Sequence, residues 1–111
     1  MTSMNDADRA WQNQVLELGC IVCHREGTDP AKAEIHHIRR GLGDLVDLSR
    51  VRDNYHILPL CPIHHRLGDC GTAIHAGIRE WEEAHANEEY LFLEVLELIR
   101  DKQNDFNIIG N

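Results

Sequence analysis

Two pairs of metal-binding side chains, separated by 37 residues, constrain this chain of 111 residues more than any other feature. The first pair is Cys20 and Cys23, and the second is Cys61 and His64. A gap of two residues lets both members of a pair bind one ion, and thiolate together with imidazole suits tetrahedral zinc. We therefore predict one structural Zn²⁺ site built from the two pairs. Cys70 has no partner at short spacing and is a weak competitor as a ligand.

The length of the chain suits one domain with a modest core, which a bound metal would help to stabilise. No apolar run reaches the roughly 18 residues that a membrane span requires, and the polar N-terminus lacks the regions of a signal peptide. We therefore expect a cytoplasmic protein without a membrane partner. In a reducing compartment, paired cysteines bind metal or do redox chemistry more often than they form disulfides.

The charge of the chain is unevenly distributed. The formal net charge is −8, which argues against a protein that binds nucleic acid tightly by itself, because phosphate contacts need Lys and Arg. Residues 25–66 nevertheless hold seven of the eleven basic side chains. Bound divalent cations would make this middle region locally positive. This charge distribution fits a protein that binds a polyanion briefly and releases it, or one that a partner brings to it.

The sequence pattern predicts helices at both ends and two short strands between them. Apolar residues at helical spacing predict a helix over residues 8–18, with Gly19 at its C-terminal end. Further elements follow in chain order: a strand over 33–38, a loop over 39–53, a strand over 55–58 stopped by Pro59, a short helix from about Pro62, a helix over 77–85, a C-terminal helix over 87–102 that Asn87 caps, and a loose tail over 103–111.

Two histidine doublets supply more imidazoles than one structural zinc needs. If His64 binds that zinc from a helix, His65 points about 100° away and is available for a second site. Asp69 lies four residues further on the same helix face, and His75 follows shortly after. Successive strand residues point to opposite faces, so His36 and His37 divide two roles, with one holding a cation and the other facing a substrate.

The order of these motifs resembles a known family. The matching segments lie within about residues 19–97 and are Gly-Cys-Ile-Val-Cys (19–23), Ile-His-His-Ile (35–38), Leu-Pro-Leu-Cys-Pro-Ile-His-His-Arg (58–66), Ala-Ile-His-Ala-Gly (73–77) and Trp-Glu-Glu (81–83). Together they resemble HNH nucleases that carry an added zinc knuckle. Their closest likeness is to the bacteriophage recombination-enhancement nucleases, which cut DNA where the recombinase RecA has formed a filament or a displaced loop.

The resemblance implies a fold and a domain organisation. We expect an α+β protein with a small ββα-metal HNH core and a zinc knuckle, flanked by an N-terminal helix and C-terminal helices. Residues 1–111 would form a single nuclease domain, with its core over about residues 19–86.

The resemblance also implies roles for individual residues. His37 would be the general base, since an imidazole with an ordinary pKa near 6.5 suits that work at neutral pH. His36 and His65 would hold the catalytic metal, and its third ligand would be His75 or else Asp69. Asn54 would fill the central Asn position of the family, with His56 as its rival.

The same likeness implies cofactors and partners. Besides structural Zn²⁺, a second divalent cation (Mg²⁺, Mn²⁺ or Zn²⁺) would serve catalysis. The partners would be DNA and a RecA filament, and Arg39 and Arg40, which follow the base directly, would contact phosphate. The alternative is a non-catalytic zinc-binding module that binds nucleic acid or a protein. A second metal site closed by four protein ligands would favour that alternative, because a catalytic ion keeps one position open.

Overall fold

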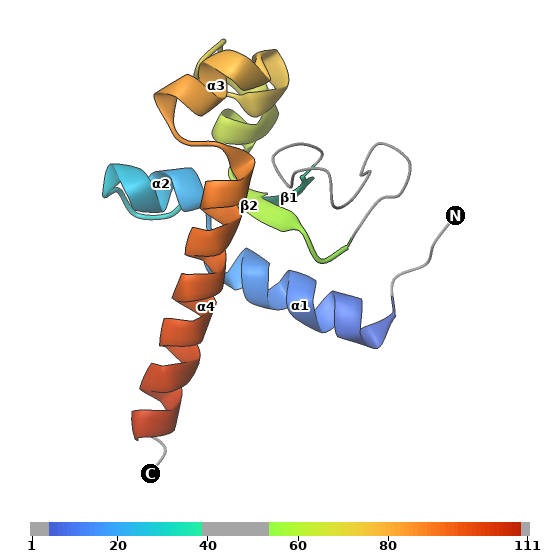
Figure 1. The fold of residues 1–111 in the computed structure, drawn as a ribbon, viewed down its shortest axis with the longest axis vertical. Coiled ribbons are helices and arrows are strands. Elements are labelled where there is room, and N and C mark those ends of the chain that lie inside the picture. The colour runs from blue at the N-terminus through green and yellow to red at the C-terminus, as the bar shows by residue number, and fades with distance from the viewer. Residues whose placement is uncertain (1–4, 39–53, 110–111) are drawn as a thin grey trace.

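Helices surround a single pair of short strands in the computed structural model, which describes residues 5–38 and 54–109, with side chains to residue 104. Figure 1 shows the arrangement of the elements. In chain order they are α1 (Asp6–Glu17), α2 (Ile21–Glu26), β1 (Glu34–His37), β2 (Ile57–Leu60), the π-helical turn η2 (Ile63–Leu67), the 3₁₀ turn η3 (Ile74–Ala76), α3 (Ile78–Ala84) and α4 (Glu88–Ile109). The predicted α+β class is therefore confirmed. The predicted loop over 39–53 lies outside the described residues.

The N-terminal helix begins earlier than its apolar pattern indicates. The side chain of Asn5 accepts a hydrogen bond from the backbone N–H of Asp8 at 2.8 Å, and the Asp8 carboxylate accepts one from the backbone N–H of Asn5. This capping box satisfies two N–H groups that the first turn leaves without helical partners, so α1 starts at Asp6 and not at Asp8. Gly19 follows the helix with a φ of +73°, as its predicted place at the C-terminal end requires.

The two strands form an antiparallel pair in which His36 lies opposite Leu58 and Ile35 lies opposite Pro59. The predicted first strand is confirmed, whereas the second lies two residues further along than predicted and contains Pro59. Ile38 N–H donates to the carbonyl of His56 at 3.0 Å. Along an antiparallel pair of strands, residue pairs that exchange hydrogen bonds alternate with pairs that do not. Pro59 therefore falls at a position that donates no bond to β1, which is why the strand tolerates it.

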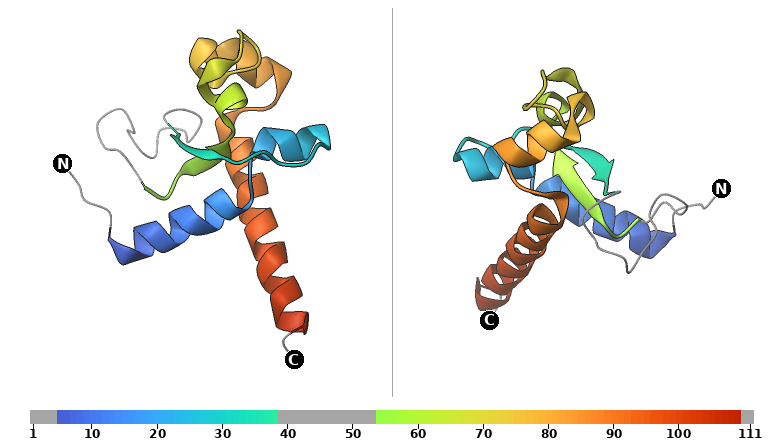
Figure 2. Two further views of the ribbon diagram at one scale, coloured as in Figure 1. Left: turned by 180° about the vertical axis from the view of Figure 1, so that it is seen from behind. Right: turned by 45° about the horizontal axis from the view of Figure 1, so that its top comes forward.

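The core forms around β2, whose four residues are all buried. β2 packs against α1, α2 and α4, and Figure 2 shows it from two further sides at the place where these helices meet. Trp81 of α3 is the largest fully buried side chain. The other large, fully buried apolar side chains come from α1, α2, β2 and α4: Val15, Ile21, Val22, Ile57, Leu58, Leu60, Leu91 and Val95.

The C-terminal helix is longer than predicted. Asn87 caps it as expected, since its side-chain oxygen accepts a hydrogen bond from the N–H of Tyr90 at 2.7 Å. α4 then continues to Ile109, so residues 103–109, predicted as a loose tail, are helical. The sequence has no Gly or Pro between residues 88 and 109 that would end the helix. In Figure 1 its C-terminal half projects away from the other elements.

No helix in the described part of the chain is both long enough and apolar enough to cross a membrane.

Candidate metal centres

The two predicted ligand pairs come together in a group of three cysteines and one histidine. The Nδ1 atom of His64 lies 3.4 Å from the Sγ of Cys20, 3.8 Å from that of Cys23 and 3.2 Å from that of Cys61. Zinc–sulfur bonds of about 2.3 Å and zinc–nitrogen bonds of about 2.0 Å at tetrahedral angles would place sulfur and nitrogen about 3.5 Å apart. The cysteine-histidine group, as we call these four residues, is therefore positioned to bind a metal such as zinc.

A tight turn between two helices presents the first pair. Gly19 takes a left-handed conformation, and a Cβ added there would lie 2.7 Å from the Cβ of Pro30. Cys20 comes next, donates its backbone N–H to the carbonyl of Ala31 at 3.0 Å and caps α2, whose first turn carries Cys23. The close approach of the Pro30 segment therefore depends on glycine at position 19.

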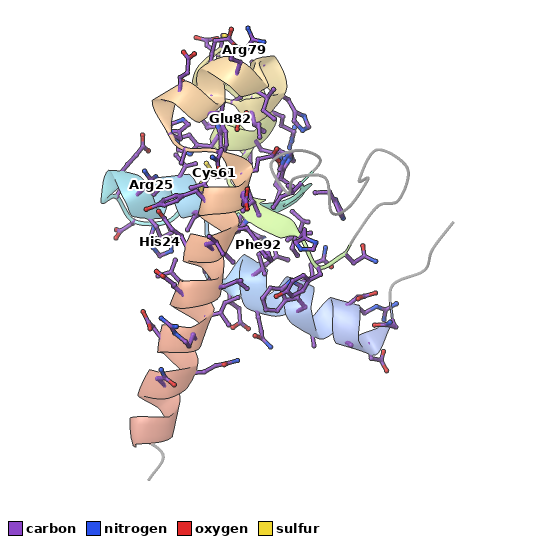
Figure 3. The ribbon with its side chains drawn as sticks, in the orientation of Figure 1. His24, Arg25, Cys61, Arg79, Glu82 and Phe92 are labelled. Carbon is purple, nitrogen blue, oxygen red and sulfur yellow. The ribbon has the colours of Figure 1, made fainter. Side chains whose placement is uncertain are left out.

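The second pair comes from the end of the buried strand. Cys61 follows β2, and His64 lies in η2 immediately afterwards. In Figure 3, Cys61 lies where α2, β2 and the start of α4 converge. The outer nitrogen of His64, Nε2, lies 3.4 Å from a carboxylate oxygen of Glu26. Metal-binding histidines commonly direct their second nitrogen to a carboxylate in this way.

Burial keeps the Cys20 thiol protonated without metal. Cys20 is fully buried, and Cys23, Cys61 and His64 are each exposed by less than a tenth. Removal from water raises the pKa of the Cys20 thiol to about 12. A metal bound there must therefore displace a thiol proton.

A second group contains three histidines from three different elements. His36 lies in β1, His65 in η2 and His75 in η3, and one nitrogen of each lies within 4.8 Å of the others. The ring centroids of His65 and His75 are 4.4 Å apart, and His36 lies 5.3 Å from His65 and 5.9 Å from His75. We call these residues the triple-histidine group. His75 is exposed, so the group borders solvent.

In two members of the triple-histidine group, one ring nitrogen lies within hydrogen-bond distance of a carboxylate. His36 Nε2 lies 2.8 Å from Glu88 Oε2, and His65 Nδ1 lies 2.8 Å from Glu34 Oε1. A neutral imidazole has one N–H and one lone pair, so a carboxylate on one nitrogen leaves the other to bind a cation. Hydrogen bonds from Arg66 and then from His65 lower the pKa of Glu34 to about 2, so this carboxylate is ionised at neutral pH.

The geometry of η2 separates the adjacent histidines. The N–H of His65 donates to the carbonyl of Cys61, and that of Gly68 donates to the carbonyl of Ile63, five residues earlier. Gly68 then takes an extended conformation and ends the turn, so Asp69 does not continue one helix face from His65 as predicted. Asp69 is exposed and lies outside the triple-histidine group.

Of the other predicted site residues in the described part of the chain, His37 and His56 are not members of the triple-histidine group. His37 is half-buried and lies on the strand position opposite Ile57. The side-chain N–H of Asn54 donates to the carboxylate of Asp8 at 3.4 Å. Its rival His56 packs its ring against Phe92 at 5.1 Å between centroids. Predictions for Arg39 and Arg40 fall outside the described residues.

The sequence pattern assigned no role at the metal sites to Glu34 or Glu88, and it gave Glu88 only a place at the N-terminal end of the last helix. Glu88 and Glu89 both suit the positive end of a helix, and only the fold distinguishes them, because Glu88 is 1% exposed and Glu89 is exposed. Glu34 precedes the histidine doublet by two residues on a strand, which places it on the same face as His36. That alternation could have drawn attention to Glu34.

No protein-family model matches this sequence, and no curated protein matches it.

Proposed function

We propose that this protein is a metal-dependent endonuclease that hydrolyses phosphodiester bonds of DNA, and that β1, β2 and η2 form an HNH-type ββα-metal core. The division of His64 and His65 between the cysteine-histidine group and the triple-histidine group carries the proposal. One group has the composition of a structural zinc site, and the other consists of imidazoles alone at the edge of solvent.

The number of ligands in the triple-histidine group favours catalysis. Structural zinc sites close with four protein ligands, whereas catalytic sites use three and keep a position for water or substrate. In the part of the chain that the structure describes, three side chains make up this group. A divalent cation held there would act as a Lewis acid on the scissile phosphate and offset the charge of the departing 3′ oxygen. Three imidazoles favour Mn²⁺ or Zn²⁺ over Mg²⁺, which prefers oxygen ligands.

His37 is the proposed general base. Strand alternation places its side chain on the opposite face of β1 from His36, so it is not a member of the triple-histidine group. In the proposed reaction, the imidazole of His37 accepts a proton from the attacking water.

Asn54 and the arginines after β1 have supporting roles in this proposal. Asn54 connects the segment before β2 to α1 through Asp8, and this contact would keep β2 in register beside His37. Arg39 and Arg40 would contact phosphates next to the cut. Because the net charge of −8 weakens binding to a polyanion, a RecA filament on DNA is the proposed partner that brings the enzyme to its substrate.

A cleavage assay tests this function. The purified protein is incubated with single-stranded DNA and with DNA carrying a displaced loop, with and without RecA and ATP, in Mg²⁺, Mn²⁺ or Zn²⁺. We expect metal-dependent cutting that His37→Ala abolishes while fold and zinc content stay intact. His24→Gln is the control, because its amide can still donate to the carbonyl of Leu18 as His24 does.

Two results would contradict the proposal. A His37→Ala variant that cuts at the parent rate would remove His37 as the base. A parent protein that carries both metals and cuts no substrate, even with RecA and ATP, would favour the non-catalytic zinc-binding module.

A further inference from the structure

A buried carboxylate beside the triple-histidine group has no structural explanation of its own. Glu88 is the first residue of α4, and its side chain is only 1% exposed. One of its oxygens, Oε2, lies 2.8 Å from His36 Nε2, and the other, Oε1, has no hydrogen-bond partner among the described residues. Burial of a carboxylate is costly unless charges and hydrogen bonds compensate for it. The position of Glu88 therefore needs a compensating group.

The start of α4 does not by itself require this burial. An acidic side chain near a helix N-terminus is favourable, but Glu89, the next residue, provides one while it remains exposed to water. An apolar side chain of similar volume at position 88 would fill the same space without the cost of a buried charge. What an apolar side chain could not do is accept a hydrogen bond from His36.

The hydrogen bond to Glu88 would determine which nitrogen of His36 carries the proton and which keeps the lone pair. A carboxylate accepts the N–H at Nε2, and the neutral ring then keeps its lone pair on Nδ1. We propose that Glu88 is a positioning residue of the cation site in the triple-histidine group, which holds His36 as the Nε2–H tautomer so that Nδ1 binds the cation. This inference rests on the proposed cation site and extends it to the C-terminal helix.

The same contact explains how the charge of Glu88 is compensated. A cation bound to Nδ1 of His36 would lie one imidazole ring away from the carboxylate, and its positive charge would offset the burial of the negative one. The contact also joins the first turn of α4 to β1, two segments whose contacting residues are 52 positions apart in the sequence. Cation binding and the docking of α4 are therefore coupled.

Cation affinity tests this role. With zinc loaded into the cysteine-histidine group, Co²⁺ is titrated into the parent and into Glu88→Leu, Glu88→Gln and Glu89→Gln variants, and binding is followed by visible absorption. We expect Glu88→Leu to bind Co²⁺ about 10- to 100-fold more weakly, as is typical when the outer partner of a metal-binding histidine is removed. Glu88→Gln keeps an acceptor and should lose less, and Glu89→Gln should bind as the parent does.

Two further measurements separate positioning from structure. Unfolding by urea without Co²⁺ should show that Glu88→Leu is close to the parent in stability, because the removal of a buried carboxylate offsets the loss of an acceptor for the His36 N–H. Nitrogen-15 NMR of the imidazoles without Co²⁺ should show His36 as the Nε2–H tautomer in the parent and as a mixture in Glu88→Leu.

The inference would be overturned by a Glu88→Leu protein that binds Co²⁺ as tightly as the parent, or by a parent whose His36 carries its proton on Nδ1. A parent that binds no second cation would overturn it together with the proposed function. A parent that binds Co²⁺ with the expected dependence on Glu88 and cuts no DNA would overturn the endonuclease alone.

Discussion

The imidazoles of His64 and His65, adjacent in the chain, face two different groups of metal-binding side chains. His64 Nδ1 lies 3.2 Å from the Sγ of Cys61, whereas His65 Nδ1 lies 2.8 Å from the carboxylate of Glu34, and the ring of His65 stacks edge-on to that of His75. Neighbouring residues of a helical turn point about 100° apart, so one short turn can serve two sites. A change in η2 therefore affects both groups, whereas a change in one ligand affects only its own.

Loss of a cysteine from the cysteine-histidine group should unfold the core. Total stability of a domain is about 5–15 kcal/mol, and structural zinc contributes about 10–16 kcal/mol of binding free energy in small zinc domains. We expect Cys61→Ser to lose zinc and most of its helical circular dichroism at 25 °C. The matched control is Cys70→Ser, because Cys70 is exposed and outside the group. Equal stability of the two variants would show that the group does not support the fold.

Spacing along the chain predicted the ligands that local geometry brings together. Cys20 and Cys23 lie on one turn, as do Cys61 and His64, so the separation of two residues was enough to pair them. The departure of His65 from its neighbour followed from helix geometry in the same way.

Contacts that depend on chain reversals could not be predicted from spacing. The extended conformation of Gly68 ends η2 and brings His75, not Asp69, to the triple-histidine group. Pro59 was expected to end the second strand. Only the register of the two strands shows that Pro59 lies at a position where β1 needs no N–H donor from β2. Glu88 reaches His36 across 52 residues, a contact that no local pattern in α4 encodes.

Zinc binding to the cysteine-histidine group should release protons. Burial raises the pKa of the Cys20 thiol to about 12 in the folded protein, and a cysteine thiol of an unfolded chain has a pKa of about 8.5, so in either state the thiol is protonated at neutral pH and zinc must displace its proton. The apparent zinc affinity should then rise with pH, by about tenfold per pH unit for each proton released. Titration calorimetry at pH 7 in buffers of different ionisation enthalpy gives the number of protons directly. A binding enthalpy that does not depend on the buffer would contradict a protonated site.

Removal of His75 should weaken second-cation binding strongly and leave the fold intact. His75 is exposed in η3, so His75→Ala buries no polar group and creates no cavity. Because it removes one of three ligands, it should weaken Co²⁺ binding by more than the loss of about 10- to 100-fold typical for an outer partner. Bound zinc and the urea midpoint should match those of the parent. Asp69→Asn is the comparison, because Asp69 competed for the same role, and a larger effect from Asp69→Asn would reassign the third ligand.

Gly19 and Gly27 provide a test of the backbone that presents Cys20. Both have positive φ, +73° and +76°, where an alanine costs about 1–2 kcal/mol. A Cβ at position 27 would meet nothing within 4 Å, whereas one at position 19 would lie 2.7 Å from the Cβ of Pro30. Gly19→Ala should therefore lower the free energy of unfolding by more than Gly27→Ala does, and should also weaken zinc binding, since Cys20 follows directly. Urea unfolding measures the free energy of unfolding, and competition with a zinc chelator measures zinc affinity. If both quantities fall equally in the two variants, the Pro30 segment accommodates the added methyl group without moving Cys20.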